Sequence, residues 1–434
     1  MQETGVQSGV RVGAGVSGHL DGVAGAEFAI ARCAEGLAGS RPDLVMLFIS
    51  SHHVDAAKSI AHVVQKKLDP RVLVGCSAEA VLGGTVEMEN SPGVALCGMA
   101  LPGMQVKTFI TDELPINREA AAADPAAMVS AAGFGPDHKA TFLLCDPFSV
   151  PLNTLLPVMT RARNGASGLK SGEDGHRLGP MLGGLASGAP KPGGNALFMD
   201  DRILRSGGVG VSLSGDGLRV QAMVSQGCRP IGVPLVVTGV KAQMIQTLGG
   251  RPALRVLGEM LDGLSEAMRE KLKRGLFIGR AINEYKQRFG RDDFLIRNVI
   301  GVDKAHEAIA VADLLRVGQT IQFHLRDAQT ASEDLALLLD AQKLYDPPAG
   351  VVLFSCNGRG TRLFEKPHHD AQAISRAFAP ALSAEQQAKG GTPIPAPTGS
   401  VPLAGFFCAG EIGPVGDQVF VHGQAACAAV IRKA

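Results

Sequence analysis

Short runs of apolar residues alternate along this chain with longer stretches in which apolar residues recur every three or four positions. DLVMLFIS (43–50), RVLVG (71–75) and GVALCGMAL (93–101) are typical of buried strands. AGAEFAIARCAEGLA (24–38) and VDAAKSIAHVVQKKLD (54–69) have the spacing of helices that bury one face. This alternation predicts a mixed α/β fold, in which sheets are flanked by helices.

The same order of strands and helices recurs twice further along the chain. In the middle, NREAAAADPAAMVSAAG predicts a helix up to the break at Pro125. A strand, a helix and a strand are then expected at 141–146, 153–163 and 180–188. Toward the C-terminus the pattern predicts helices at 328–344 and 370–382 and strands at 350–356, 402–408 and 418–424.

Three of the predicted strands run into similar glycine-rich turns, which indicates internal duplication. They read LVGCSAEAVLGG (73–84), MLGGLASGAPKPGG (181–194) and AGFFCAGEIGPVG (404–416). The first and third share a cysteine followed three positions later by a glutamate, Cys76 with Glu79 and Cys408 with Glu411. We therefore expect the strands that carry Cys76 and Cys408 to hold equivalent positions in two related sheets.

The chain is expected to form two related domains, each a mixed sheet flanked by helices. Its 434 residues are too many for one ordinary core. The clearest change of pattern lies near residues 227–240, where strands give way to RPALRVLGEMLDGLSEAMREKLKR (251–274), which predicts one long helix. We therefore predict domains at 20–238 and 239–434.

Composition narrows the classes of partner. The formal net charge of +1 creates no field that favours nucleic acid or an anionic membrane, and the absence of Trp with only 2 Tyr disfavours stacking on bases. No apolar run is long enough for a transmembrane helix, and the first residues lack the pattern of a signal peptide. The 8 cysteines are scattered without CxxC pairs, which predicts reduced thiols in a cytoplasmic protein.

The run VVLFSCNGRG (351–360) has the pattern of a buried strand that ends in polar side chains, which predicts a ligand site at the carboxyl end of a strand. Gly358 and Gly360 would allow a sharp turn that holds Arg359, whose guanidinium suits a carboxylate. Arg359 as an ordinary surface turn residue is the alternative. Arg297 lies inside the apolar pattern FLIRNVIG and must find a partner, either the ligand or a structural ion pair.

Acidic and thiol side chains at other strand ends would complete such a site. Glu79 or Glu411 could accept from a ligand ammonium group, although either could equally stabilise the start of a helix. Asn357 could bind either end of the ligand. We expect the thiols to line the pocket wall. The remaining candidate ligand-binding residues are Cys76, Ser77, Cys356 and Cys408.

Two other classes of function compete with ligand binding. A cysteine-dependent enzyme, a hydrolase or transferase acting on a small metabolite, would need a base near a thiol. The candidate bases are His52, His53, His368, His369 and His422. The pairs SSHHVD and KPHHDA lack the usual metal-ligand spacing, and no Walker loop or dinucleotide motif occurs, so no metal or cofactor is predicted. A pure interaction protein would not need complementary polar groups at its strand ends.

Several of these motifs resemble the FIST domain family, whose name abbreviates F-box and intracellular signal transduction. The C-terminal half of that family is similar to VVLFSCNGRGTRLF and PLAGFFCAGEIGPVGDQVFVHGQAA, and the N-terminal half to DLVMLFISSHHVDAA and VLVGCSAEAVLGG. The likeness covers about residues 40–425. It implies a sensory, small-ligand-binding module, with amino acids as proposed ligands and with a separate signalling protein as the output partner.

Overall fold

The computed structural model describes residues 9–117, 122–168, 179–273, 275–286, 288–290, 293–379 and 401–434, which form two compact units. The first unit consists of Met1–Val224, Ala336–Val421 and Ala426–Ala434. The second consists of Ser225–Leu335 and His422–Ala425. The chain therefore leaves the first unit and later returns to it.

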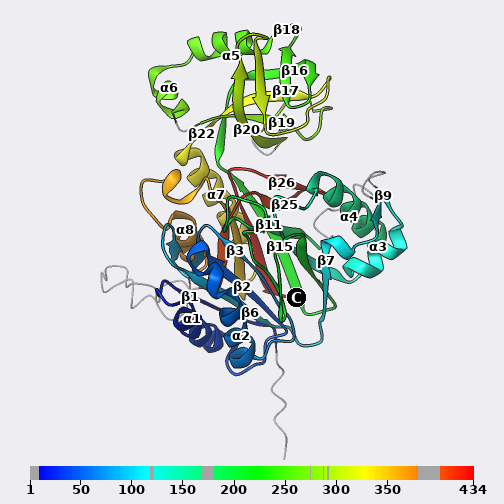
Figure 1. Cartoon of the computed structure of the whole chain (residues 1–434), viewed down its shortest axis with the longest axis vertical. Coiled ribbons are helices and arrows are strands. Elements are labelled where there is room, and N and C mark those ends of the chain that lie inside the picture. Colours follow the sequence, from blue (N-terminus) through cyan, green and yellow to red (C-terminus); the bar gives the residue numbers. More distant parts are fainter. Residues whose placement is uncertain are drawn as a thin grey trace, which may run out of the picture. The chain divides into compact units, whose positions relative to one another are not determined.

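Three six-stranded sheets build the first unit (Figure 1). The first sheet has the order β1 (Arg11–Ser17), β6 (Val94–Ala100), β2 (Leu44–Ser50), β3 (Leu73–Ala78), β12 (Leu197–Met199) and β13 (Arg202–Leu204). The second has the order β7 (Gln105–Ile110), β14 (Gly208–Ser214), β10 (His138–Cys145), β11 (Met181–Leu185), β25 (Glu411–Val415) and β26 (Gln418–His422). The third has the order β15 (Leu218–Gln226), β27 (Ala425–Lys433), β23 (Gly350–Cys356), β24 (Leu403–Cys408), β4 (Val81–Gly83) and β5 (Val86–Met88).

The three sheets share one plan and exchange their hairpins in a cycle. Each sheet has a parallel pair at its centre: β2–β3, β10–β11 or β23–β24. The hairpin that follows each pair joins a different sheet. Thus β4–β5 pairs with β24, β12–β13 with β3, and β25–β26 with β11. The three glycine-rich segments aligned in the sequence are the second strands of the three parallel pairs and the turns that follow them.

Glycine fixes the register of all three parallel pairs. A Cβ built on Gly75, Gly183 or Gly405 would overlap the carbonyl group of a leucine in the partner strand, far inside the 3.0 Å that real Cβ atoms respect. Those leucines are Leu47, Leu143 and Leu353. Because only glycine lets the two backbones approach this closely, these three positions are structurally equivalent.

This register confirms one expectation from the sequence and corrects another. The strands that carry Cys76 and Cys408 hold equivalent positions in their sheets, as predicted. The pairing of the two cysteines was wrong by two residues. Gly75 pairs with Leu47 and Gly405 with Leu353, so Cys408, three residues after its glycine, is the counterpart of Ala78 rather than of Cys76. The close backbone approach, rather than the shared C-x-x-E motif, sets the alignment.

Helices cover the sheets, and an aspartate begins the first helix of each repeat. These helices are α1 (Gly22–Leu37), α3 (Pro125–Ala132) and α7 (Ala328–Gln342). Asp21 accepts from the Ala24 N–H, Asp124 from the Ala126 N–H, and Asp327 from the N–H groups of Gln329 and Thr330. A carboxylate at this position satisfies N–H groups that have no partner within the helix. The second helix of each repeat is α2 (Ala57–Leu68), α4 (Leu152–Ala166) or α8 (His369–Ala377).

The second unit is an insertion between β15 and α7, in the loop between the first strand and first helix of the third repeat. Its strands are β16 (Cys228–Lys241), β22 (Thr320–Arg326), β19 (Leu276–Ala281), β20 (Phe294–Asp303), β21 (Ala308–Val311), β17 (Met244–Leu248) and β18 (Arg251–Pro252). Because β16 also pairs with β17, the sheet closes on itself. It has two hydrophobic clusters, one largely aliphatic around Phe323 and a smaller one that contains Phe277 and Phe294.

The mixed α/β class is confirmed, with mixed sheets flanked by helices. The predicted helix 251–274 is instead two helices, α5 (Ala253–Asp262) and α6 (Glu266–Leu272), because Gly263 ends the first and Ser265 begins the second. Position 274 lies outside the described residues. The predicted domain boundary between residues 238 and 239 stays a prediction. The two compact units do not test it, because the second unit is inserted into the first.

Two further predicted helices touch parts of the chain that the structure does not describe. Of the helix expected before Pro125, residues 118–121 lie outside the described residues, and Ala122–Ala123 form the short strand β9, paired with β8 (Ile116–Asn117). The observed helix begins at Pro125, whose fixed φ suits a first helical position. Of the helix predicted at 370–382, residues 380–382 lie outside the described residues.

Candidate functional site

A small polar hollow lies where β3 and β23 reach their carboxyl ends. Its volume of about 20 Å³ is enough for one water molecule. The lining residues follow β3, β5 and β23 or belong to β24 and the short helix η4 (Gly360–Arg362). They are Glu79, Ala80, Glu89, Asn90, Asn357, Thr361, Arg362 and Phe407. Two of the predicted binding residues, Glu79 and Asn357, therefore share this hollow.

An ion pair of Arg362 with Glu79 spans the hollow. The Arg362 side chain is 52% exposed and that of Glu79 35% exposed. The Arg362 guanidinium also donates to the second Glu79 carboxylate oxygen at 3.2 Å and to the Asn357 carbonyl oxygen at 3.0 Å. Sequence reasoning missed Arg362, although it stands three residues after Arg359 in the same CNGRGTR run.

The wall beside this ion pair is held by a second carboxylate. Glu89 accepts from the Thr361 N–H at 3.0 Å and from the Thr361 hydroxyl at 2.8 Å. Gly360 has φ of 56°, and a side chain there would collide with the Glu89 carboxylate. The glycine predicted to permit a sharp turn is therefore required for its backbone angle.

Asn357 contributes an unsatisfied acceptor to the site. Its Oδ1 is buried and has no hydrogen-bond partner among the described residues. Leaving such an atom without a partner costs free energy, and a donor entering the hollow would remove that cost. The hollow thus offers a cation, an anion and a free acceptor side by side.

Arg359 was expected either to bind a ligand or to lie in a surface turn, and the structure shows neither. It is fully buried, and its guanidinium donates to the two oxygens of Asp370 at 2.6 and 2.9 Å. Burial disfavours both charges, but each stabilises the other. The Asp370 carboxylate raises the pKa of Arg359, and despite the opposing effect of burial, Arg359 lowers that of Asp370. Arg359 is neither a surface turn residue nor exposed to a ligand in this conformation; it anchors the turn that carries Arg362.

The remaining predicted residues of the first unit form a buried layer. Cys76, Cys408 and Glu411 are 0% exposed, and Cys356 is 6% exposed. Burial raises the pKa of the Cys76 and Cys408 thiols well above the ordinary value. Because the thiolate is the nucleophile, this environment makes Cys76 and Cys408 poor nucleophiles.

Two other predicted binding residues, Ser77 and Arg297, have structural roles. The buried Ser77 hydroxyl accepts from the Ala196 N–H at 2.9 Å and so joins β3 to the residue before β12. Arg297 belongs to the second unit, where its Nε donates to Asp313 at 3.1 Å. The structural ion pair, which was the alternative for Arg297, is therefore observed.

Two of the candidate bases, His368 and His369, have hydrogen-bond or ring-stacking partners. His368 Nδ1 accepts from the Glu87 N–H at 3.0 Å, and His369 Nδ1 lies 2.9 Å from Asp370, its ring stacked on Phe364. Within the described ranges, no group of three His, Cys, Asp or Glu side chains is arranged to hold a metal ion. No helix in those ranges is long and apolar enough to cross a membrane.

All eight cysteines are free and buried, which makes thiol accessibility a direct test of the fold. We expect a thiol reagent to react slowly with the native protein and to titrate all 8 thiols in denaturant without reductant. Fewer than eight would reveal a disulfide. A rapidly reacting thiol in the native state would show that the buried layer opens.

Two family models match consecutive parts of the chain, the FIST N domain at residues 43–251 and the FIST C domain at residues 253–414. The chain is 36% identical over 424 residues to the uncharacterized protein Rv0628c of Mycobacterium tuberculosis, covering 97% of this chain and 99% of that protein. It is 35% identical over 426 residues to the uncharacterized protein Mb0898c of Mycobacterium bovis, with 97% and 98% covered.

Among solved structures, a cyanuric acid hydrolase from A. caulinodans aligns with 98% of this chain and 99% of its own, at a TM-score of 0.34 and 11% identity. FIST domains are sensory domains of signal transduction. With both halves matched in order and relatives aligned over nearly the whole length, the chain belongs to the FIST family.

Proposed function

We propose that this protein is a cytoplasmic small-ligand sensor for signal transduction and that the hollow between Glu79 and Arg362 binds an amino acid. The observation that carries the proposal is the facing pair of opposite charges beside the unsatisfied Oδ1 of Asn357. A zwitterion that leaves water needs charged or hydrogen-bonded partners at both ends. Here Arg362 would take the carboxylate, and Glu79 with Asn357 would take the ammonium.

The ligand must replace the contact of Glu79 with Arg362, because about 20 Å³ holds one water and no amino acid. The energetic cost of this opening is small. Both side chains are partly exposed, and exposed ion pairs contribute about 0–1 kcal/mol. Each charge would exchange one partner for another, and the planar guanidinium could bind a carboxylate with two parallel bonds.

The buried layer supports this site without touching the ligand. Arg359, fixed by Asp370, holds the turn that ends in Arg362, while Cys76, Cys356, Cys408 and Glu411 fill the space at the strand ends. The proposed binding set therefore keeps Glu79 and Asn357 and uses Arg362 in place of Arg359. A separate signalling protein would receive the output.

Screening the 20 amino acids by thermal shift, followed by calorimetry, tests the proposal. We expect Arg362→Gln and Glu79→Gln each to weaken binding of the best amino acid roughly tenfold to a hundredfold, because each removes one charge-assisted contact. Arg376→Gln is the matched control: it removes the same charge from an exposed position outside the hollow. It should bind like the wild type.

Two results would contradict this function. Equal binding by wild type, Arg362→Gln and Glu79→Gln would place the ligand elsewhere. If no amino acid binds while a thioester or peptide is turned over, the cysteine-dependent enzyme replaces the sensor.

A further inference from the structure

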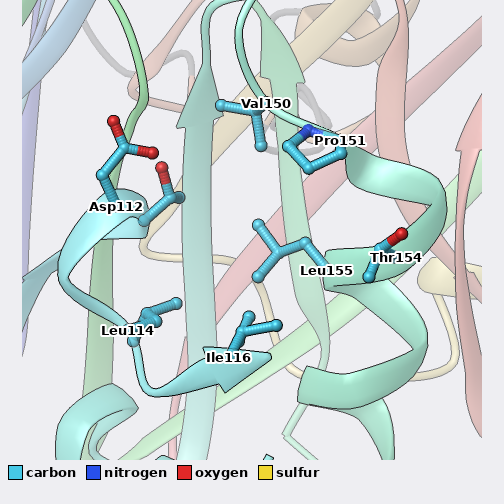
Figure 2. Close-up of a pocket in the computed structure, with 8 residues that line it drawn as sticks. Asp112, Leu114, Ile116, Val150, Pro151, Thr154 and Leu155 are labelled. Carbon is cyan, nitrogen blue, oxygen red and sulfur yellow. The ribbon is translucent and has the colours of Figure 1, made fainter. Parts of the chain in front are cut away.

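A larger hollow of the first unit, about 60 Å³ in volume, lies between η2 (Thr111–Glu113), β8 and the start of α4 (Figure 2). Its wall is mostly aliphatic and includes Leu114, Ile116 and Leu155. Its charged residue, Asp112, already has an interaction partner in the protein. None of the residues that line this hollow therefore offers a ligand a charge without a partner.

A buried carboxyl group beside the polar hollow of Glu79 and Arg362 is less well satisfied. Glu87, in β5, is 3% exposed. Its Oε1 accepts from the Ala371 N–H at 3.0 Å, whereas its Oε2 is buried and has no hydrogen-bond partner among the described residues. A buried carboxylate with one unpaired oxygen is unfavourable, and binding a proton removes its charge.

The charged and titratable groups that face Glu87 or contact its neighbours come from three elements. They are Glu89 after the same strand, Arg359 before η4, and His368, His369 and Asp370 at the start of α8. The paired strand β4 presents the uncharged Leu82 opposite Glu87. Burial, followed by the Asp370 and Glu89 carboxylates, raises the pKa of Glu87 to about 8. We therefore expect this side chain to hold a proton at neutral pH.

Two connections lead from this carboxyl group to the polar hollow. The first runs along the chain, because Glu89 follows β5 and accepts from the Thr361 N–H at 3.0 Å. The second runs through the start of α8, where Asp370 holds the buried Arg359 and with it the turn that carries Arg362. A charge that appears between these connections would act on both ends of the turn.

The start of α8 has a backbone conformation that is sensitive to such a charge. His368, which precedes the helix, has φ of 67°, a region sparsely populated by residues with a side chain. Its Nδ1 accepts from the Glu87 N–H at 3.0 Å. A strained position held by its surroundings can shift when those surroundings change.

We propose that Glu87 is a proton-binding switch of the polar hollow, whose protonated form holds Thr361 and Arg362 in place and whose ionised form displaces them. On ionisation the proton leaves to water, and the new negative charge repels Asp370 and weakens its contact with Arg359. The affinity of the hollow for an amino acid then falls as the pH rises through about 8. This effect on affinity rests on the proposed function, whereas the titration and the displacement do not.

NMR of the full chain, with isotope labels at glutamate carboxyl and at alanine and threonine methyl groups, tests the titration. The wild type should show a carboxyl signal with a midpoint near pH 8 that is missing from Glu87→Gln. The methyl signals of Thr361 and Ala371 should move with the same midpoint in the wild type and stay still in Glu87→Gln. Glu365→Gln is the matched control: it removes an exposed acid and should keep the titration.

Urea unfolding measures the same proton without a ligand. Because the folded pKa lies above the ordinary value of 4.5, the wild type should lose stability between that pH and about 8 and change little above it. Glu87→Gln has nearly the shape of the protonated side chain and carries no charge. It should therefore lack this loss and unfold at a higher urea concentration than the wild type above about pH 8.

Calorimetry with the best binder of the 20 amino acids, at about pH 7 and pH 9, tests the effect on the site. Between these values the affinity of the wild type should fall relative to that of Glu87→Gln by roughly fivefold or more. The amine of the amino acid titrates equally in both experiments, so the ratio isolates the protein.

Three results would overturn the switch: a titration near pH 8 that persists in Glu87→Gln or is absent from the wild type, methyl signals that do not follow it, or an unchanged ratio of affinities. If no amino acid binds at all, the proposed function fails, and the carboxyl and methyl signals still decide whether Glu87 is a switch.

Discussion

Gly75→Ala and Gly405→Ala are each expected to lower the free energy of unfolding by more than about 4 kcal/mol, enough to prevent folding of the first unit. In each case the new Cβ would overlap the backbone of the neighbouring parallel strand. That strand cannot move aside, because it lies in the middle of its sheet and pairs with another strand on its far side. Soluble yield and urea unfolding measure the effect.

Gly165→Ala is the matched control for these glycines. It makes the same chemical change at an exposed position inside α4, where a Cβ would meet nothing within 4 Å. Alanine is the better helix former, so this variant should gain roughly 0.5–1 kcal/mol. If Gly75→Ala unfolds at the same urea concentration as the wild type, the backbones are not as close as described.

Asp370→Ala is expected to cost about 3–5 kcal/mol, since it leaves the fully buried Arg359 charge without its carboxylate. The ion pair also makes the free energy of unfolding depend on pH. Asp370 has its pKa lowered in the folded state by Arg359, against the effect of burial. Its contribution is present above the unfolded pKa of about 4 and is lost as the pH falls from there toward the folded value.

Chemical denaturation across acidic pH checks this prediction. The wild type should lose stability below about pH 4 more steeply than Asp370→Ala. Glu365→Ala removes an exposed acid from the same segment and should change stability by no more than about 0.5 kcal/mol. Combining Arg359→Met with Asp370→Leu should restore much of the loss, because it removes both buried charges. A double variant as unstable as Asp370→Ala would argue against the ion pair.

Most strands and helices, and their repeated order, were predictable because each depends on a local pattern of apolar residues. A continuous apolar run identifies a buried strand wherever it occurs, and DLVMLFIS and VVLFSC both became central strands of parallel pairs. The glycine-rich segments were also aligned correctly as strands. The predicted alignment of Cys76 with Cys408 was wrong because it relied on a cysteine and a glutamate alone. The true alignment is set by the glycines at which the paired backbones touch.

Burial of charged side chains was not predictable from the sequence. Arg359 and Arg362 stand in the same glycine-rich run, yet one pairs with Asp370 in the core and the other with Glu79 at the hollow. Both partners lie elsewhere in the chain, so the choice depends on packing between segments that no local pattern describes.

The cyclic exchange of hairpins has a consequence for synthesis of the chain on the ribosome. The first sheet stays incomplete until β12–β13 of the second repeat has emerged, and the second sheet waits for β25–β26 of the third. The edge strands of an incomplete sheet have unpaired N–H and C=O groups, which can pair with other nascent chains. The inserted second unit lies between β14 and β25, so it lengthens the wait of the second sheet by about 100 residues, or roughly 5–20 s at common translation rates. A chaperone that covers sheet edges would therefore have most effect on this protein while residues 225–335 are being translated.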